Sequence, residues 1–145
     1  MPPPGNTTTG KVLEDTIIPA LTRGRYEFTP QKVLGHPRLG GGRHKVDAEV
    51  KDPRTGEMFL VSLKWQQTSG TAEQKIPFEV MSLAHAIANC GGRYKRAFLV
   101  LGGTKKFRLK DFYTNGGVRD WLRGCEAVTI IDWNEFVARA NDGKL

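Results

Sequence analysis

The chain has 145 residues, of which 39% are hydrophobic and 26% charged, an ordinary composition for a single globular domain. No apolar run approaches the roughly 18–20 residues that a membrane helix needs, and the N-terminus lacks the pattern of a secretion signal, so we expect a cytoplasmic protein. Lys and Arg total 22 against 15 acidic residues, and the net charge of +7 favours a polyanionic partner such as nucleic acid.

The N-terminal segment predicts a disordered lead-in followed by one helix. Residues 1–9, rich in Pro and Thr, form the lead-in, and residues 10–145 are expected to form a single domain. Thr9 is a suitable helix N-cap. Pro19 should end the helix near Ile18 or kink it. The apolar residues after the cap recur at helical spacing: Leu13, Ile17, Ala20 and Leu21.

The next segments predict a short strand, a loop and a hairpin. Residues 25–28 favour the strand, and the Pro and Gly residues of 29–42 favour a mobile loop. Residues 44–50 and 58–65 alternate between apolar and polar side chains on either side of a turn. A turn centred near Arg54 and Thr55 places the following pairs opposite each other: Asp47 with Ser62, and Lys45 with Lys64. A slip of two residues would keep Asp47 and Lys64 on one face, whereas a slip of one would separate them.

The second half predicts helices alternating with buried strands. Thr71 and Gln74 fit a capping box, and an apolar stripe from Ile76 to Ile87 predicts a long helix that Gly91 and Gly92 end. The later elements are predicted as follows: a buried strand at 96–101, a basic segment at 105–110, a short helix at 118–123, a buried strand at 128–132, and a final helix at 133–140 capped by Asp132.

The hairpin offers a platform for phosphodiester hydrolysis, which needs a divalent cation held by oxygen ligands and a charged group near the attacking water. The string K-V-D-A-E-V, a turn, and F-L-V-S-L-K-W-Q resembles the paired half-motifs of the PD-(D/E)XK nuclease superfamily, over roughly residues 11–101. The resemblance implies an α/β, restriction-endonuclease-like fold with an αβββαβ core and a mixed central sheet flanked by helices. It also implies a DNA endonuclease that uses Mg²⁺, with Mn²⁺ as a substitute, in a protein of phage or bacterial origin.

The same resemblance assigns roles to three residues of the hairpin. Asp47 corresponds to the metal-binding aspartate, and Lys64 to the lysine that positions or polarises the nucleophile. The carbonyl of Leu63 corresponds to a frequent metal ligand.

Ser62 departs from the family pattern, which has Asp or Glu at this position. Some restriction endonucleases carry this S-x-K variant and supply the carboxylate from the following helix. That helix offers Glu79, which borders the apolar stripe, and Glu73 in its first turn. Helix-face geometry favours Glu79.

Two further residues are candidates for the site. Glu14 lies beside the apolar stripe of the first helix, where related resolvases and nucleases place a metal-supporting glutamate; the alternative is a solvated helix residue. Gln66 continues the face of Ser62 and Lys64, where the family often has an assisting glutamine; an ordinary polar strand end fits equally well.

Basic residues cluster around the hairpin and after the buried strand. The loop before the first hairpin strand carries Arg38, Arg43, His44 and Lys45, and the segment after the buried strand carries Lys105, Lys106 and Arg108. These side chains are expected to contact DNA phosphates.

Three functions remain open on the sequence alone. The first is a DNA endonuclease, expected to act as a homodimer because two cuts in a duplex need two sites. The second is a catalytically silent DNA-binding module, for which Ser62 argues. The third is a basic scaffold protein that binds no nucleic acid. Zinc is not expected, because Cys90 and Cys125 form no Cys/His cluster.

Overall fold

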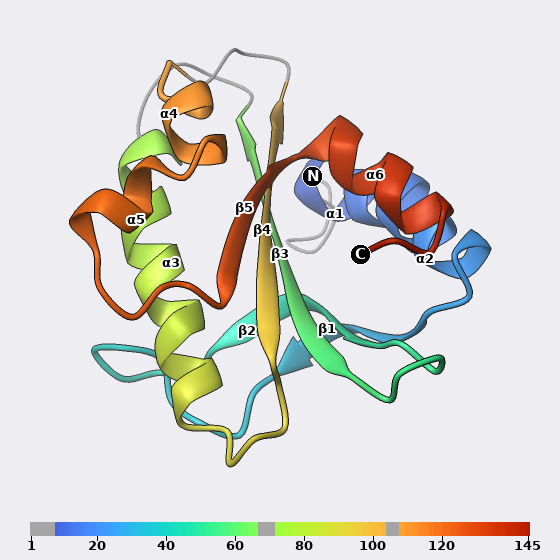
Figure 1. Cartoon of the computed structure of the whole chain (residues 1–145), viewed down its shortest axis with the longest axis horizontal. Helices are drawn as coiled ribbons and strands as arrows, with labels where there is room; N and C mark the ends of the chain where they lie inside the picture. The colour runs from blue at the N-terminus through green and yellow to red at the C-terminus, as the bar shows by residue number, and fades with distance from the viewer. Residues whose placement is uncertain (1–7, 67–71, 104–107) are drawn as a thin grey trace, which may run out of the picture.

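The computed structural model describes residues 8–66, 72–103 and 108–145, and its centre is a five-stranded sheet between two layers of helices (Figure 1). The strands are β1 (Glu27–Val33), β2 (Lys45–Lys51), β3 (Met58–Gln66), β4 (Arg96–Gly103) and β5 (Val128–Asp132), and they lie in sequence order across the sheet. Pairings β1–β2 and β2–β3 are antiparallel, whereas β3–β4 and β4–β5 are parallel. The α/β class and the mixed central sheet are therefore confirmed.

Helices cover both faces of this sheet (Figure 1). One face carries α3 (Ala72–Ala88), α4 (Lys110–Thr114) and α5 (Gly117–Trp121); the other carries α1 (Thr8–Val12), η1 (Leu13–Ile17), α2 (Ile18–Arg23) and α6 (Trp133–Asn141). Each face has its own apolar core. Leu60 and Leu99 pack with Ile76 and Leu83 of α3, whereas Phe59 and Phe98 pack on the opposite side against the helices of the chain ends.

The N-terminal helix contains one π-helical turn directly before Pro19. Helix α1 begins at Thr8, η1 widens the helix over Leu13–Ile17, and Pro19 lies in the first turn of α2. Proline lacks the amide proton of a normal helical bond, and its ring crowds the carbonyl four residues earlier. The wider turn accommodates Pro19, so the helix continues to Arg23. Residues 1–7 of the predicted lead-in lie outside the described residues. Thr8 and Thr9 differ from the expectation, because both belong to α1 and Thr9 is therefore not its N-cap.

Strand β1 is longer than the sequence suggested. It runs to Val33 and therefore includes residues 29–33, which were expected to belong to a mobile loop. Proline is tolerated on an edge strand because no neighbour needs its amide proton. Among the described strands β1 pairs with β2 alone, so Pro30 lies on such an edge.

The predicted hairpin register is confirmed. Strands β2 and β3 pair from Lys51 opposite Met58 to Ala48 opposite Val61. The same register, carried one residue further, sets Asp47 opposite Ser62. Val46, expected on the same face as Ala48 and Val50, instead packs in the core beneath α3. The pairs between β2 and β3 end at Ala48, whereas β2 stays paired with β1 as far as Lys45. Beyond Ala48, the two faces of β2 are therefore no longer aligned with the two faces of β3.

The C-terminal half follows the predicted order with one additional helix. Helix α4 forms at the end of the expected basic segment, and α5 lies close to the expected short helix. Asp132 caps α6 as predicted, because its carboxylate accepts a hydrogen bond of 3.0 Å from the amide of Asn134. Thr71, the predicted cap of α3, lies outside the described residues. Within the described ranges, no helix has the length and apolar character needed to span a bilayer.

Candidate active site

Asp47 is fixed at the point where strands β2 and β3 separate. Its Oδ2 accepts a hydrogen bond of 2.6 Å from the main-chain amide of Leu63. The main-chain pairs between β2 and β3 have ended at this point, so this side-chain bond is what connects Asp47 to β3. The Asp47 side chain is half-buried and lines a cavity.

Lys64 and Glu79 meet across the gap between strand β3 and helix α3. The Nζ atom of Lys64 lies 3.6 Å from Oε2 of Glu79. Glu79 is only 5% exposed, and it lies on the helix face of Ile76 and Leu83, both buried against the sheet. Residues three and four positions apart share a helix face, which explains why α3 directs this glutamate toward the sheet.

A cavity of about 410 Å³ joins these groups. It opens beside the end of the β2–β3 pairing and is bounded by strands β1, β2 and β3, by α3, and by α1. The residues that line it are Thr9, Gln31, Lys45, Asp47, Ser62, Leu63, Lys64, Trp65, Lys75 and Glu79. Both of the strongest candidate ligands and the candidate catalytic lysine therefore share one pocket.

The surroundings of Asp47 in this pocket raise the pKa of its carboxyl group. Burial raises the pKa of the Asp47 carboxyl, and the negative charge of Glu79 acts in the same direction. The Leu63 amide, Lys64 and Lys45 oppose that rise in the pKa. A divalent cation between two partly desolvated carboxylates would relieve their repulsion.

This donor set fits Mg²⁺. No group of three or more His, Cys, Asp or Glu side chains is arranged to hold a metal in the described part of the chain. Mg²⁺, however, usually takes only one or two protein carboxylates and completes its shell with water and substrate phosphate. Asp47 and Glu79 meet that requirement, and Leu63 lines the same pocket.

Three predicted site residues lie outside this pocket. Glu73 accepts a hydrogen bond of 3.0 Å from the amide of Leu109, so it fastens α4 to α3. Glu14 is exposed on η1, and Gln66 is buried at the end of β3; neither lines the cavity. The structure therefore brings Glu79, and not Glu73 or Glu14, to Asp47.

The predicted DNA contacts fall into four groups. Arg38 is half-buried and forms an ion pair of 2.8 Å with Glu79. Arg43, Lys45 and Arg108 are exposed, and Lys45 also lines the cavity. Lys105 and Lys106 lie outside the described residues. His44 differs from the expectation: it is 2% exposed, and burial lowers the pKa of its imidazole, so it is not placed to meet a phosphate. Leu34 donates a main-chain hydrogen bond of 2.8 Å to the His44 carbonyl, which places His44 at the base of its loop.

Four lining residues were not among the predicted site residues: Thr9, Gln31, Trp65 and Lys75. Lys75 lies one helical turn before Glu79, so its position on the same face could have been inferred from spacing. Gln31 lies opposite Asp47 on β1 and has a φ of 54°, a backbone conformation that is uncommon for a residue with a side chain. No sequence signal pointed to Gln31, because its segment was expected to be a loop.

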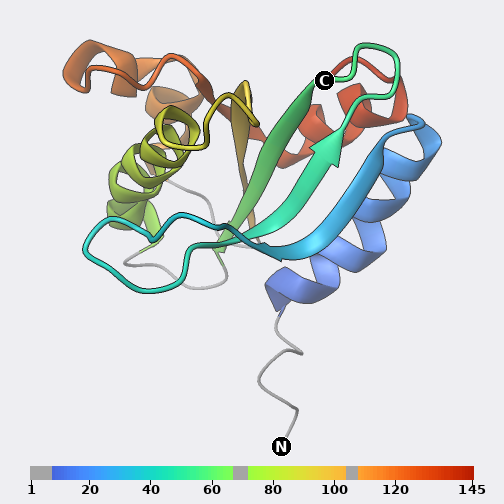
Figure 2. The ribbon, with the colours of Figure 1, turned by 90° about the horizontal axis from the view of Figure 1, so that it is seen from below.

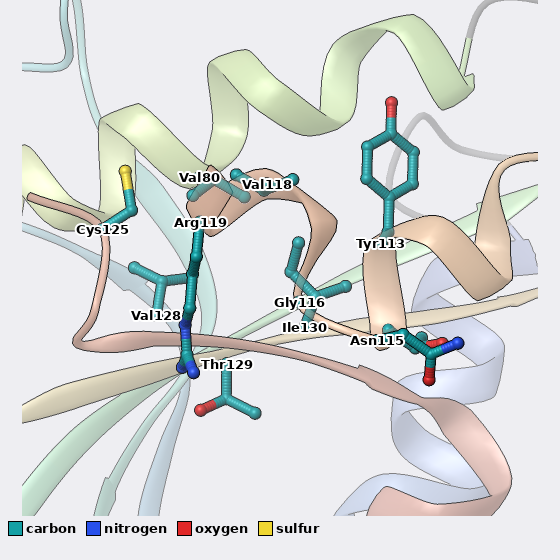
Figure 3. A pocket seen from close by; sticks show the side chains of 11 residues that line it. Val80, Tyr113, Asn115, Gly116, Val118, Arg119, Cys125, Val128, Thr129 and Ile130 are labelled. Atoms are coloured by element: carbon teal, nitrogen blue, oxygen red, sulfur yellow. The ribbon is translucent and has the colours of Figure 1, made fainter. Parts of the chain in front are cut away.

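A second cavity, of about 300 Å³, lies between α3, the α4–α5 segment and β5 (Figure 3). Val80, Val118 and Val128 form much of its wall, with Arg119 and Asn115 among its polar groups. None of its lining residues carries a carboxylate or an imidazole. It therefore offers no carboxylate ligand for Mg²⁺ and no imidazole to act as a general base.

Comparisons with known proteins identify the family and the fold. A family model described as a PD-(D/E)XK nuclease superfamily domain matches residues 5–142 and confirms the resemblance seen in the hairpin. A crystal structure described as a protein of unknown function, AF1548, is similar with a TM-score of 0.52 at 9% identity, over 81% of this chain and 55% of that one. The chain thus spans about half of that protein's length, and the likeness shows the fold alone. No curated protein matches the chain.

Proposed function

Because the chain belongs to the PD-(D/E)XK nuclease superfamily, we propose that it is a metal-dependent endonuclease that hydrolyses phosphodiester bonds in DNA. The observation that carries the proposal is the convergence of Asp47, Lys64 and Glu79 on one cavity, from two strands and a helix. Asp47, Glu79 and the Leu63 carbonyl would hold Mg²⁺, with Mn²⁺ as a substitute. The bound cation would supply Lewis-acid polarisation and a water of lowered pKa.

The residues of the chain then perform the remaining tasks. The Lys64 ammonium lies close enough to Glu79 to orient the attacking water or to stabilise the charge that develops on the phosphate. Lys45 and Lys75, at the edge of the same cavity, hold the phosphates next to the reacting one. Strand-borne groups such as Asp47 and Lys64 keep their geometry better than groups on loops.

The experiment that tests this proposal measures cleavage of supercoiled plasmid and of branched DNA against Mg²⁺ concentration, with EDTA as the control. We expect cleavage that depends on metal, with a preference for branched DNA, since a domain of this size has little surface left for reading bases. Cuts in both strands would require two sites, so we propose a homodimer, which sedimentation analysis would test.

A catalytically silent DNA-binding module is the second candidate. Ser62 favours it, because a hydroxyl is a weak Mg²⁺ ligand compared with the carboxylate usual at that position. Binding of DNA without any metal-dependent cleavage of either substrate would move this candidate to the front.

DNA binding should be strongly salt-dependent. Raising salt from about 50 to 200 mM should weaken binding by about 10³-fold if roughly six phosphates are contacted, because each contact releases condensed counterions. Lys45→Gln should reduce the slope of log affinity against log salt by about 0.9. Lys144→Gln is the matched control. Lys144 is exposed and its amide donates a hydrogen bond to the Arg139 carbonyl of α6, a helix that lies across the sheet from α3 (Figure 1). Fluorescence anisotropy would measure the DNA affinity of each variant as a function of salt. An equal change in the salt slope for the two variants would contradict the placement of DNA at this cavity.

A further inference from the structure

The loop between β1 and β2, residues 34–44, is attached to the carboxylate that we assign to the metal. Figure 2 shows this loop extending from the sheet to lie below α3. The Nη2 atom of Arg38 lies 2.8 Å from Oε2 of Glu79, the same oxygen that Lys64 approaches. Arg38 therefore neutralises a carboxylate that a divalent cation would also neutralise.

The loop makes further contacts with the same helix. The Arg38 guanidinium lies over the Phe78 ring, 5.1 Å from its centroid, and the rings of His36 and His85 lie 5.0 Å apart. His44, at the base of the loop, is close enough to Glu79 for that carboxylate to act on its pKa. The loop is thus docked on α3 around Glu79.

This docked arrangement leaves two polar atoms without hydrogen bonds. Nε of Arg38 and Nε2 of His44 are buried and have no partner among the described residues. Buried polar groups are normally paired, because an unpaired one loses its hydration without compensation. The contact between Arg38 and Glu79 is therefore incompletely satisfied, which favours a second position for Arg38.

The loop can supply that second position without disturbing the strands. Gly41 donates a hydrogen bond of 2.8 Å to the carbonyl of Arg38, and Arg38 donates one of 3.1 Å to the carbonyl of Gly42, so Arg38 stands at the base of a tight turn. Gly40, Gly41 and Gly42 all have positive φ, between 84° and 93°. Glycine passes between such conformations and negative φ at little cost.

We propose that Arg38 is a positioning residue that exchanges Glu79 for a DNA phosphate when the metal binds. A guanidinium pairs with phosphate as well as with carboxylate, through the same planar set of donors. Metal and Arg38 compete for the Glu79 carboxylate. Metal binding and DNA binding each strengthen the other, because the arginine that the metal releases becomes a DNA contact. This inference rests on the proposed function, because it takes Glu79 as a metal ligand.

The exchange predicts opposite effects of one substitution on two affinities. Arg38→Gln should tighten Mg²⁺ binding in the absence of DNA by roughly three- to tenfold, because a charged hydrogen bond that competes with the metal is lost and its partial exposure moderates the gain. It should weaken DNA binding in Ca²⁺ and reduce the salt slope by about 0.9. Isothermal titration calorimetry and anisotropy on a labelled duplex would measure these quantities.

Arg43→Gln is the matched control. Arg43 lies on the same loop and is exposed, and the ion pairs recorded for Glu79 among the described residues are those with Arg38 and Lys64. The substitution removes the same charge from a neighbouring position of the loop, so DNA binding should weaken while Mg²⁺ affinity changes less than about twofold. A purely structural role for Arg38 would give weaker binding of both ligands, and that result would overturn the proposal.

A measurement on the wild-type protein does not depend on the variant's folding. Trypsin should cleave after Arg38 several-fold faster in Mg²⁺ than in NaCl of equal ionic strength, with cleavage after Arg43 as the internal reference. An unchanged ratio of the two cleavages would overturn the exchange. Equal Mg²⁺ affinity of Glu79→Gln and the wild-type protein would likewise overturn the exchange, because Glu79 would then not be a metal ligand. The proposed function fails separately: if the wild-type protein cleaves neither plasmid nor branched DNA in Mg²⁺, the nuclease proposal falls whatever the ratio of the two trypsin cleavages.

Discussion

Replacing Asp47 with asparagine is expected to reduce Mg²⁺-dependent cleavage at least about 10³-fold and, at the same time, to raise the melting temperature of the metal-free protein. The loss of activity follows from the loss of a charged metal ligand, since metal-assisted stabilisation of a phosphoryl transition state amounts to several kcal/mol. The amide oxygen of the new side chain would still accept the hydrogen bond from the Leu63 amide, which is 2.6 Å long in the native protein, so the local fold should persist.

The gain in stability follows from the direction of the pKa shift. Burial raises the pKa of the Asp47 carboxyl above its value in the unfolded chain, so the folded state binds this proton more tightly. Stability is therefore lost as the pH rises from the unfolded-state pKa through the folded-state pKa, and the loss is complete once the pH exceeds the folded-state pKa. The asparagine side chain does not ionise, so the variant does not lose stability in this way as the pH rises.

Thermal unfolding in EDTA would measure the effect at about pH 7 and again at about pH 3, below the ordinary pKa of aspartate. The variant should melt higher than wild type at neutral pH, and the difference should narrow at the lower pH. Asp111→Asn is the control, because Asp111 is exposed on α4 and should change neither stability nor cleavage. Cleavage by Asp47→Asn at a rate near wild type would place the active site elsewhere.

The parts of the fold that the sequence predicted well depend on local interactions. The hairpin register follows from strict alternation and a short turn, which leave little choice of pairing. The cap of α6 follows from Asp132 and the amide two residues later. The approach of Glu79 to the sheet follows from helical spacing to Ile76 and Leu83. Each of these needs only the residues within one element or one turn.

The parts that could not be predicted depend on contacts between distant segments. Residues 29–33 carry turn-forming residues, yet they form a strand because the edge of β2 offers partners. Glu73 was a reasonable alternative to Glu79 until Leu109, 36 positions away, was seen to donate a hydrogen bond to it. The contact of Arg38 with Glu79 joins residues 41 positions apart. No local pattern contains that information.

Glu79→Gln tests whether the missing motif carboxylate is supplied by the helix. Glutamine keeps the shape of the side chain but removes the charge that would hold the cation, so single-turnover cleavage at limiting Mg²⁺ should fall by about 10²- to 10³-fold. The Mg²⁺ concentration needed for half-maximal cleavage should also rise at least about tenfold. Ser62→Ala should have a mild effect, because the hydroxyl is at most a weak ligand.

The decisive variant restores the usual motif in the damaged background. Ser62 and Glu79 line the same cavity, one from β3 and the other from α3, so a carboxylate at either position can reach the same space. Ser62→Glu combined with Glu79→Gln should therefore recover part of the lost activity and lower the Mg²⁺ requirement. Ser62→Gln in the same background is the control, because it adds the same bulk without the charge. Equal activity of these two double variants would show that the charge at this place is not what matters. A different result would assign the second ligand elsewhere. If Glu79→Gln keeps the wild-type dependence of cleavage on Mg²⁺ while Glu73→Gln or Glu14→Gln loses it, that other glutamate is the second ligand. In that case α3 or η1 must move its glutamate into the cavity when the metal binds.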